Sequence, residues 1–450
     1  MSRAWYAHGP RLLAGLAVAA CTLLVGTPLA SASSPSARKS VALLTGAGRA
    51  KATHQCRPGR RHKHRLHRYC ATRRYRAGSR TGRNARRARN TNSSASSTAT
   101  PVSPDFYGVN GQVFDQKFMP ASQWDRHLQA IHDAGFTSVR REAWWCDVEP
   151  NPPSSGVHDY RWGELDQFVT ALASHQLRWY STISPGAAWA GGWDHPPTEE
   201  HIPDYTAFAV AIAKRYGPGG TFWQAHPELP YEPVQDFELW NEPNLKRFWG
   251  GDVSAQSAAH YGRIVAAATS AIHNVDPQAR VDAGALAYGG AIGAPNYIAQ
   301  MVQANPGLRG QVSTISFHPY GLTATRSLNR IVAVRRAVDQ WLGRDVSIEI
   351  SEDGLTLPPD SPYTINDRAA LLSKLALTLP RTDCKISGFL THAWTSQYQD
   401  PTQDDEWYGI ADWNTAQLDA SGIALRNAVL REEGRSTTPP ASGTVHLCYG

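Results

Sequence analysis

The feature that most restricts the fold of this chain is an alternation of two residue patterns that begins at Asp105. Short runs rich in Val, Ile and Phe alternate with longer stretches in which apolar residues recur at helical spacing. This alternation is typical of β-α units around a parallel sheet, because a β-sandwich would require short strands separated only by turns.

Eight of the short runs are candidate strands. They cover residues 106–110, 138–143, 178–183, 234–240, 280–285, 314–318, 346–351 and 386–393. The candidate helices include residues 122–134, 165–175, 204–215, 257–274, 331–342, 365–379 and 421–432. Eight strand-helix repeats within 346 residues fit an α/β fold of the (β/α)8 TIM barrel type, which takes about 250 residues and tolerates long loops. A doubly wound open sheet is the alternative.

The net charge of the chain changes sign at the start of this pattern. Residues 1–104 contain 20 Lys or Arg and no Asp or Glu, whereas the rest of the chain has 25 basic and 38 acidic residues, a net charge of −13. A single globular body rarely separates charge in this way. The sequence therefore predicts a basic leader and tail, followed by an acidic folded domain over residues 105–450.

Residues 1–32 have the pattern of a signal peptide. Two arginines precede an apolar stretch over residues 12–29, and the small residues at 30–32 suit a signal peptidase. We therefore expect a secreted protein, either free or associated with the cell wall, with no transmembrane segment in its mature form. An uncleaved membrane anchor and lipidation at Cys21 are alternatives.

Residues 33–104 are expected to form a disordered basic tail that ends in a linker. Residues 51–90 hold 15 basic residues, and residues 91–100 form a Ser/Thr/Asn run. In an exported protein such a tail suits an anionic cell-wall polymer or an acidic glycan better than a nucleic acid, although a solvated spacer is the alternative. Cys56 and Cys70 within the tail are expected to pair in a disulfide, with zinc ligation as the alternative.

Two large classes of enzyme are disfavoured by missing motifs. No phosphate-binding loop or dinucleotide glycine fingerprint follows a candidate strand, and no His-Glu-x-x-His motif is present. We therefore expect no nucleotide, no other cofactor and no dedicated metal centre. Catalysis on this domain would have to depend on carboxylates.

Two candidate strands end in carboxylates, at the end of a barrel where reactive groups are usually found. The fourth strand leads into Glu242 and the seventh ends at Glu352. These residues are 110 positions apart, about three strand-helix units, so a closed barrel could bring them together.

The residues around both glutamates resemble a known group of enzymes. The motif Trp-Asn-Glu-Pro at residues 240–243 is similar to the signature of the clan A retaining glycoside hydrolases, and Ser-Glu-x-Gly at residues 351–354 resembles the nucleophile strand of that clan. The longer motif over residues 238–249 is similar to family 39, the group of β-xylosidases and α-L-iduronidases. The Asp-Gly continuation at residues 353–354 looks more like family 5 cellulases.

The resemblance covers residues 106–432 and implies an enzyme that cleaves β-linked glycans with retention. It implies that Glu242 is the acid and then the base, and that Glu352 is the nucleophile. The further residues to which it gives a role in substrate binding are Arg140, Asn241, His318, Tyr320 and Trp394.

The chemistry explains why these residue types occur together. Retention needs a protonated acid and an ionised nucleophile about 5 to 5.5 Å apart. Arg140 could keep Glu352 ionised through a charge-assisted hydrogen bond, and Tyr320 could donate to the same carboxylate. Asn241 would bond the 2-hydroxyl of the sugar.

Several of these residues have competitors. Glu349 is the alternative nucleophile, Arg141 the alternative inward-pointing arginine, and His318 could be a hydrogen-bonded core histidine. Glu238 is expected to point into the barrel behind Glu242.

The tryptophans and cysteines give weaker indications. Fourteen of the 15 tryptophans lie in the domain, and aromatic planes stack on the apolar faces of sugars. Trp394 is the first candidate for this contact, followed by Trp249 and Trp193. The loops over residues 189–197 and 400–413 are expected to shape the cleft.

We also expect a disulfide between Cys384 and Cys448, with Cys146 left as a free thiol.

Two other functions fit the same sequence. A transglycosidase uses the same two carboxylates but transfers the sugar to a hydroxyl group other than that of water. A non-catalytic protein that binds carbohydrate or the cell wall could keep the barrel and work through its basic tail.

Overall fold

The computed structural model describes residues 101–397 and 399–450 of the chain. The predicted signal peptide, nearly all of the predicted tail and the predicted Cys56–Cys70 pair lie outside these residues. Within the described part of the chain, no helix combines the length and the apolar character needed to cross a membrane.

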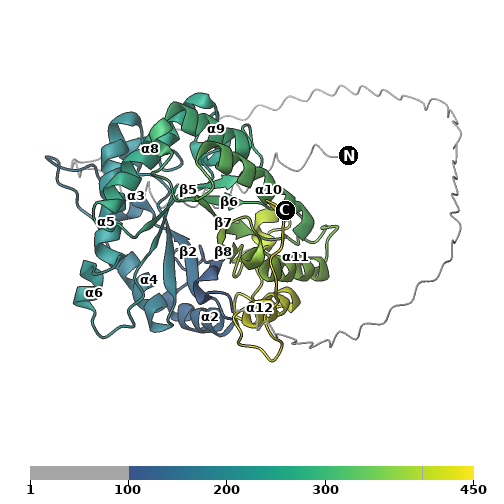
Figure 1. Ribbon diagram of the computed structural model, residues 1–450. Coiled ribbons are helices and arrows are strands. Elements are labelled where there is room, and N and C mark those ends of the chain that lie inside the picture. Colours follow the sequence, from purple (N-terminus) through teal and green to yellow (C-terminus); the bar gives the residue numbers. More distant parts are fainter. Residues whose placement is uncertain (1–100, 398) are drawn as a thin grey trace, which may run out of the picture. The chain divides into compact units, whose positions relative to one another are not determined.

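Eight parallel strands form a closed barrel in chain order (Figure 1). The strands are β1 (Tyr107–Asn110), β2 (Ser138–Glu142), β3 (Arg178–Thr182), β4 (Asp236–Leu239), β5 (Arg280–Ala287), β6 (Thr314–His318), β7 (Ser347–Asp353) and β8 (Ile386–Thr391). The barrel closes because β1 pairs with β8 as well as with β2. The predicted (β/α)8 barrel is confirmed, every predicted strand is present, and the open-sheet alternative is wrong.

Helices follow the strands and surround the barrel (Figure 1). The α-helices are α2 (Ala121–Asp133), α3 (Trp145–Val148), α4 (Gly163–Ser174), α5 (Ile202–Tyr216), α6 (Thr221–Ala225), α7 (Lys246–Trp249), α8 (Ala255–His273), α9 (Ala294–Ala304), α10 (Ala324–Trp341), α11 (Ile365–Thr378) and α12 (Ala420–Glu432). The 3-10 helices are η1 (Pro104–Phe106), η2 (Ala188–Ala190), η3 (Glu199–His201), η4 (Pro306–Leu308), η5 (Leu379–Arg381) and η6 (Asp404–Trp407).

Side-chain caps fix the start of four of the longer helices. The side chains of Ser254, Thr323, Thr364 and Asp419 accept hydrogen bonds from backbone N–H groups in the first turns of α8, α10, α11 and α12. Such caps satisfy donors that have no partner within the helix. The cap at Thr323 also explains why α10 begins seven residues before the predicted start at residue 331.

The alternation of side chains along β2 decides which of two neighbouring arginines enters the barrel. Arg140 points inward, whereas Arg141 points to the helical layer and donates to Asp115 at 2.9 Å and to Glu164 at 2.7 Å. Successive residues of a strand face opposite sides, so only one of the two can reach the site.

A disulfide joins Cys384, just before β8, to Cys448 near the end of the chain, with 5.2 Å between their Cα atoms. This predicted pair is confirmed. Cys146 is disulfide-bonded as well, so the expectation of a free thiol at that position is wrong.

Candidate active site

The two candidate catalytic glutamates lie at the carboxyl end of the barrel. Glu242 follows β4 in a turn where Trp240 and Glu242 have positive φ angles of 76° and 43°, a conformation that non-glycine residues rarely adopt. Glu352 is the penultimate residue of β7. Their side chains are 13% and 12% exposed, so solvent reaches both carboxylates although protein surrounds them.

His318, the last residue of β6, contacts both glutamates through one atom. Its Nδ1 lies 2.9 Å from Oε1 of Glu242 and 3.6 Å from Oε2 of Glu352. The two oxygens are therefore no farther apart than these distances added together, about 6.5 Å. This limit suits the spacing of about 5 to 5.5 Å in retaining glycosidases better than the roughly 6.5 to 9.5 Å of inverting ones.

Arg140 forms hydrogen bonds to residues of three strands, β1, β4 and β7, and to a residue of the turn after β4. Its Nη1 donates to Glu352 Oε1 at 2.6 Å and to Asn110 Oδ1 at 2.8 Å, and its Nε donates to Glu238 Oε1 at 2.7 Å. Its Nη2 donates to Asn241 Oδ1 at 2.9 Å. The guanidinium is completely buried, which makes these charge-assisted hydrogen bonds strong and their geometry well defined.

The surroundings of Glu352 favour its ionised form. Burial opposes its ionisation, but His318, His392, Arg140 and the hydrogen bond from Tyr320 together lower its pKa to about 2. The Tyr320 hydroxyl donates to Oε2 at 2.6 Å, and Arg140 holds the other oxygen. Both oxygens of this carboxylate are therefore fixed.

The pKa values of the two histidines beside Glu352 are shifted in opposite directions. Burial lowers the pKa of His318, but Glu352 and the hydrogen bond with Glu242 outweigh burial, and the resulting pKa is raised. Burial prevails for His392, and the pKa of that ring is lowered.

Glu349 and Glu238 lie deeper in the barrel than the catalytic pair. Glu349 accepts a hydrogen bond from Ser387 Oγ at 2.6 Å, and burial together with Asp236 raises its pKa to about 7. Glu238 is fully buried against Arg140. Neither carboxylate contacts Glu242, which makes Glu349 a poor competitor for Glu352.

Trp394 does not lie where a sugar could contact it, contrary to the expectation. Its side chain is fully buried and its indole N–H donates to His127 Nδ1 at 3.0 Å. The reason is that β8 ends at Thr391, two residues before the predicted end, so that His392 rather than Trp394 reaches Glu352. Nδ1 of His392 is 3.7 Å from Glu352 Oε2.

The other tryptophan candidates are only partly buried. Trp249 packs edge-on against His260, with ring centroids 5.7 Å apart. Trp193 packs beside Trp144.

Sequence reasoning missed several residues of the site. Asn110 at the end of β1 accepts from Arg140, and Tyr408 packs against His392 with ring centroids 5.0 Å apart. Glu142 at the end of β2 accepts from Ser184 Oγ at 3.2 Å, and burial raises its pKa to about 7. Asn110 and Glu142 are polar residues at strand ends, a signal that could have identified them, whereas Tyr408 belongs to a loop.

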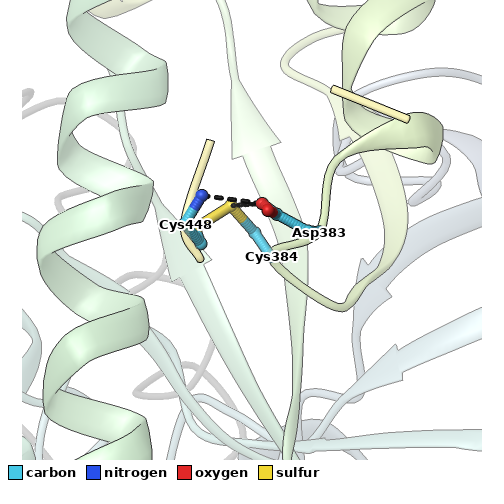
Figure 2. A group of neighbouring side chains, drawn as sticks. All are labelled: Asp383, Cys384 and Cys448. Atoms are coloured by element: carbon cyan, nitrogen blue, oxygen red, sulfur yellow. Dashed lines mark hydrogen bonds between the residues drawn. A yellow bond between two sulfur atoms is a disulfide. The ribbon is translucent and has the colours of Figure 1, made fainter. Parts of the chain in front are cut away.

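One group of described residues has the composition of a metal site, at the opposite end of β8. The side-chain donor atoms of Asp383, Cys384 and Cys448 lie within 4.8 Å of one another (Figure 2). The two sulfurs are bonded to each other, and Asp383 accepts backbone N–H groups of Leu447 and Cys448 at 2.9 and 2.7 Å. Metal ligation needs free thiolates, so this group has a structural role.

Comparisons with known proteins show what the fold is similar to. No family model matches the sequence, and no curated protein is significantly similar to it. Among solved structures, the chain is similar to a monomeric β-xylosidase from Caulobacter crescentus CB15, with 17% identity, coverage of 73% of this chain and 69% of that one, and a TM-score of 0.54.

Two further structures agree with the first. A family 39 glycoside hydrolase from Bacteroides cellulosilyticus WH2 has 19% identity, covers 72% of this chain and 64% of its own, and gives a TM-score of 0.55. A glucosidase from Croceicoccus marinus has 16% identity, coverage of 74% and 69%, and a TM-score of 0.54. None of the three is described as a family 5 enzyme, so that likeness stays a prediction. At these identities the likeness shows a shared barrel fold.

Proposed function

We propose that residues 105–450 form a retaining glycoside hydrolase that cleaves β-linked glycans by double displacement. The observation that carries this proposal is the contact of one nitrogen atom, His318 Nδ1, with both Glu242 and Glu352. This contact limits the distance between the two carboxylate oxygens to about 6.5 Å, which supports a covalent mechanism. The pairing of Glu352 with Arg140 and Tyr320 supports different roles for the two residues.

In the first step Glu352 is the nucleophile. Its carboxylate forms a bond to C1 of the sugar, the bond from C1 to the glycosidic oxygen breaks, and Glu242 gives its proton to the leaving oxygen. Arg140 and Tyr320 orient the attacking carboxylate and keep it unprotonated, which is what a nucleophile at this position needs.

In the second step Glu242 acts as a base. It takes a proton from water, the water oxygen bonds to C1, and the ester with Glu352 breaks. His318 can donate a hydrogen bond to the ionised Glu242, because its raised pKa favours the protonated ring. This hydrogen bond would stabilise the ionised form of Glu242, which is the form that acts as the base.

The choice of β-linked glycans rests on the resemblance of residues 238–249 to family 39 and on the neighbours, among which are a β-xylosidase and a glucosidase. In the covalent mechanism Asn241, held by Arg140, would contact the 2-hydroxyl of the sugar.

We also propose that the protein is exported and that its basic tail binds an anionic wall polymer or glycan. Support comes from the apolar stretch over residues 12–29 and from the 20 basic residues before Asp105.

The test is an assay of the full-length chain on aryl β-glycosides of xylose, glucose, galactose and mannose, and on oligosaccharides of the active sugar. The variants are Glu352→Gln, Glu242→Gln and, as the matched control, Glu349→Gln, which changes another buried glutamate of β7. The anomer first released is identified by NMR, and a 2-fluoro glycoside tests for a covalent adduct by mass spectrometry.

The expected result is release of the β-anomer, an adduct on Glu352, and a loss of at least about 1000-fold in Glu352→Gln. Glu349→Gln should keep most of the activity. Release of the α-anomer, or an adduct on Glu349, would contradict the mechanism. Oligosaccharide transfer without hydrolysis would favour a transglycosidase, and activity on no substrate would favour a binding protein.

A further inference from the structure

A third carboxylate lies at the same end of the barrel as Glu242 and Glu352. Glu142 is the last residue of β2, two positions after Arg140, and it still pairs in register with Thr182 of β3. Alternate residues of a strand face the same side, so the side chain of Glu142 points to the inside of the barrel as Arg140 does. Two residues advance a strand by about 6.6 Å. Glu142 therefore lies nearer the carboxyl end than Arg140, whose guanidinium binds Glu352.

One oxygen of the Glu142 side chain is free. Its Oε1 accepts a hydrogen bond from Ser184 Oγ at 3.2 Å, but its Oε2 accepts none from any residue that the structure describes. Among these residues Glu142 also has no ion-pair partner, whereas the neighbouring Arg141 has two. Glu238 Oε2 is buried without a partner, but solvent reaches Glu142 Oε2, because Glu142 is only half-buried.

The loops on both sides of β2 fix the position of this carboxylate. The backbone N–H of Glu142 donates to Oε1 of Gln112, after β1, at 3.1 Å, and the buried Ser184 follows β3. The side-chain Nε2 of Gln112 donates to no group in the described part of the chain, so a free donor lies near the free acceptor. Such a pair suits the hydroxyl groups of a sugar, which both donate and accept hydrogen bonds.

Arg140 has no N–H group left for an anionic substrate. Its Nη1 donates to Glu352 and to Asn110. Its Nε and Nη2 both bind Glu238, and Nη2 also donates to Asn241. A guanidinium has five N–H donors, and these contacts use all of them. The carboxylate of a uronic acid would therefore find no donor on this side chain.

His318, which also contacts Glu352, is used in the same way. Its Nδ1 lies between Glu242 and Glu352, and its Nε2 lies 3.1 Å from Ser351 Oγ. Both ring nitrogens thus have partners. The group that keeps a free atom is the carboxylate of Glu142, which accepts hydrogen bonds from neutral sugars and repels a second carboxylate.

We propose that Glu142 is a specificity-determining residue that binds a hydroxyl group of the sugar attacked by Glu352 and excludes uronic acids. This inference rests on the proposed function and names its substrate class, the glycosides of neutral sugars. The resemblance to family 39 leaves the class open, because a xylosidase acts on a neutral sugar and an iduronidase on a uronic acid. Asn241 would contact the 2-hydroxyl, so Glu142 binds another hydroxyl group of the same sugar.

The first experiment compares aryl β-glycosides that differ only in charge, glucosides with glucuronides and galactosides with galacturonides, on the full-length chain. Because like charges placed together cost several kcal/mol, kcat/KM should be at least about 100-fold higher for the neutral member of a pair. Glu142→Gln removes the charge and keeps an acceptor, so it should lower this ratio by at least about tenfold. Faster cleavage of the charged member, or an unchanged ratio in the variant, would overturn the inference and leave the glycosidase proposal intact.

Glu349→Gln is the matched control. Glu349 also accepts a hydrogen bond from a serine hydroxyl, that of Ser387, but it lies deeper in the barrel. The ratio of kcat/KM for neutral and charged substrates should be that of the wild type. An equal fall of the ratio in Glu349→Gln would show that any lost carboxylate has this effect, and would overturn the role of Glu142.

Monodeoxy glycosides of the active sugar locate the hydroxyl group. Removing the hydroxyl that Glu142 binds should lower kcat/KM of the wild type by at least about tenfold, since hydrogen bonds to charged groups are strong. The same substrate should cost Glu142→Ala less than about threefold, because the contact is already lost. A merely structural residue would affect all substrates alike. Equal losses in wild type and variant for every deoxy position would overturn the inference.

A binding measurement separates this inference from the glycosidase proposal. The affinity of Glu352→Gln for neutral disaccharides and for the corresponding aldobiouronic acids is compared by calorimetry at pH 8, which requires no turnover. Burial raises the pKa of Glu142 to about 7, so its carboxylate is mainly ionised at this pH. Tighter binding of a neutral sugar by at least about tenfold, and a smaller difference in Glu352→Gln/Glu142→Gln, support the inference even if no substrate is cleaved. Equal binding of the two classes, or binding of neither, overturns it.

Discussion

Arg140 Nη1 donates a hydrogen bond to Glu352 Oε1 at 2.6 Å, and the guanidinium of Arg140 is completely buried. The same side chain holds Glu238 and Asn241. One arginine therefore favours the ionised form of the candidate nucleophile and fixes the position of a residue next to the candidate acid.

Replacing Arg140 by Lys is expected to reduce kcat/KM by roughly 100-fold, because a lysine cannot make the planar set of donated bonds. Arg141→Lys, at the neighbouring buried arginine, is the control: it should lower the melting temperature and keep most of the activity. Equal kcat/KM values for Arg140→Lys and the wild type would contradict the assignment.

Tyr320→Phe removes the hydrogen bond donated to Glu352 Oε2 and leaves the ring in place. Because hydrogen bonds to charged groups contribute about 1.5 to 3 kcal/mol, kcat/KM is expected to fall by about tenfold or more. Tyr408→Phe, on the ring that packs against Tyr320, should have a smaller effect. Steady-state kinetics of the two variants decide this, and equal losses would argue against a specific role for the Tyr320 hydroxyl.

Glu349→Gln is expected to stabilise the protein at alkaline pH. Burial raises the pKa of Glu349 from 4.5 to about 7, so the native state binds the proton more tightly than the unfolded state. The stability that the protonated carboxyl provides is complete below pH 4.5 and is lost as pH rises through 7. The variant should therefore be more stable than wild type by about 3 kcal/mol above pH 8, and similar to it near pH 4. Urea unfolding at both pH values measures this, and a difference that does not depend on pH would contradict it.

Replacing Cys384 and Cys448 together by Ser should lower stability by about 4 kcal/mol, the chain-entropy value for a closed loop of 64 residues. Activity at 25 °C should remain, because the disulfide lies at the end of β8 away from Glu352. Substitution is a cleaner test than reduction, since Cys146 is also disulfide-bonded and a reductant would affect it too. An unchanged melting temperature would show that the last residues stay in place without the bond.

The barrel could be predicted because each strand is a short apolar run bounded by helical stretches. Helix α9 was missed because it follows a glycine-rich loop and has Pro295 in its first turn, a combination that reads as loop although proline is tolerated there. The proximity of Glu242 and Glu352 could be predicted because strand ends gather at one end of a barrel.

The remaining parts of the site could not be predicted, for two physical reasons. The role expected for Trp394 was wrong because β8 ends at Thr391 and the chain then leaves the strand, so that His392 rather than Trp394 lies beside Glu352. Tyr408 belongs to a loop without periodicity, and its contact with His392 follows from where the closed barrel places the start of that loop.

The anchored end of the chain has a practical consequence. Cys448 is bonded to Cys384, and Asp383 accepts backbone N–H groups on either side of it, so the last residues lie at the amino end of β8. Glu242 and Glu352 lie at the other end of the barrel, where the strands end. A linker attached to Gly450 would project away from the cleft, so the protein could be coupled to a solid support through this end with its substrate-binding face toward the solution.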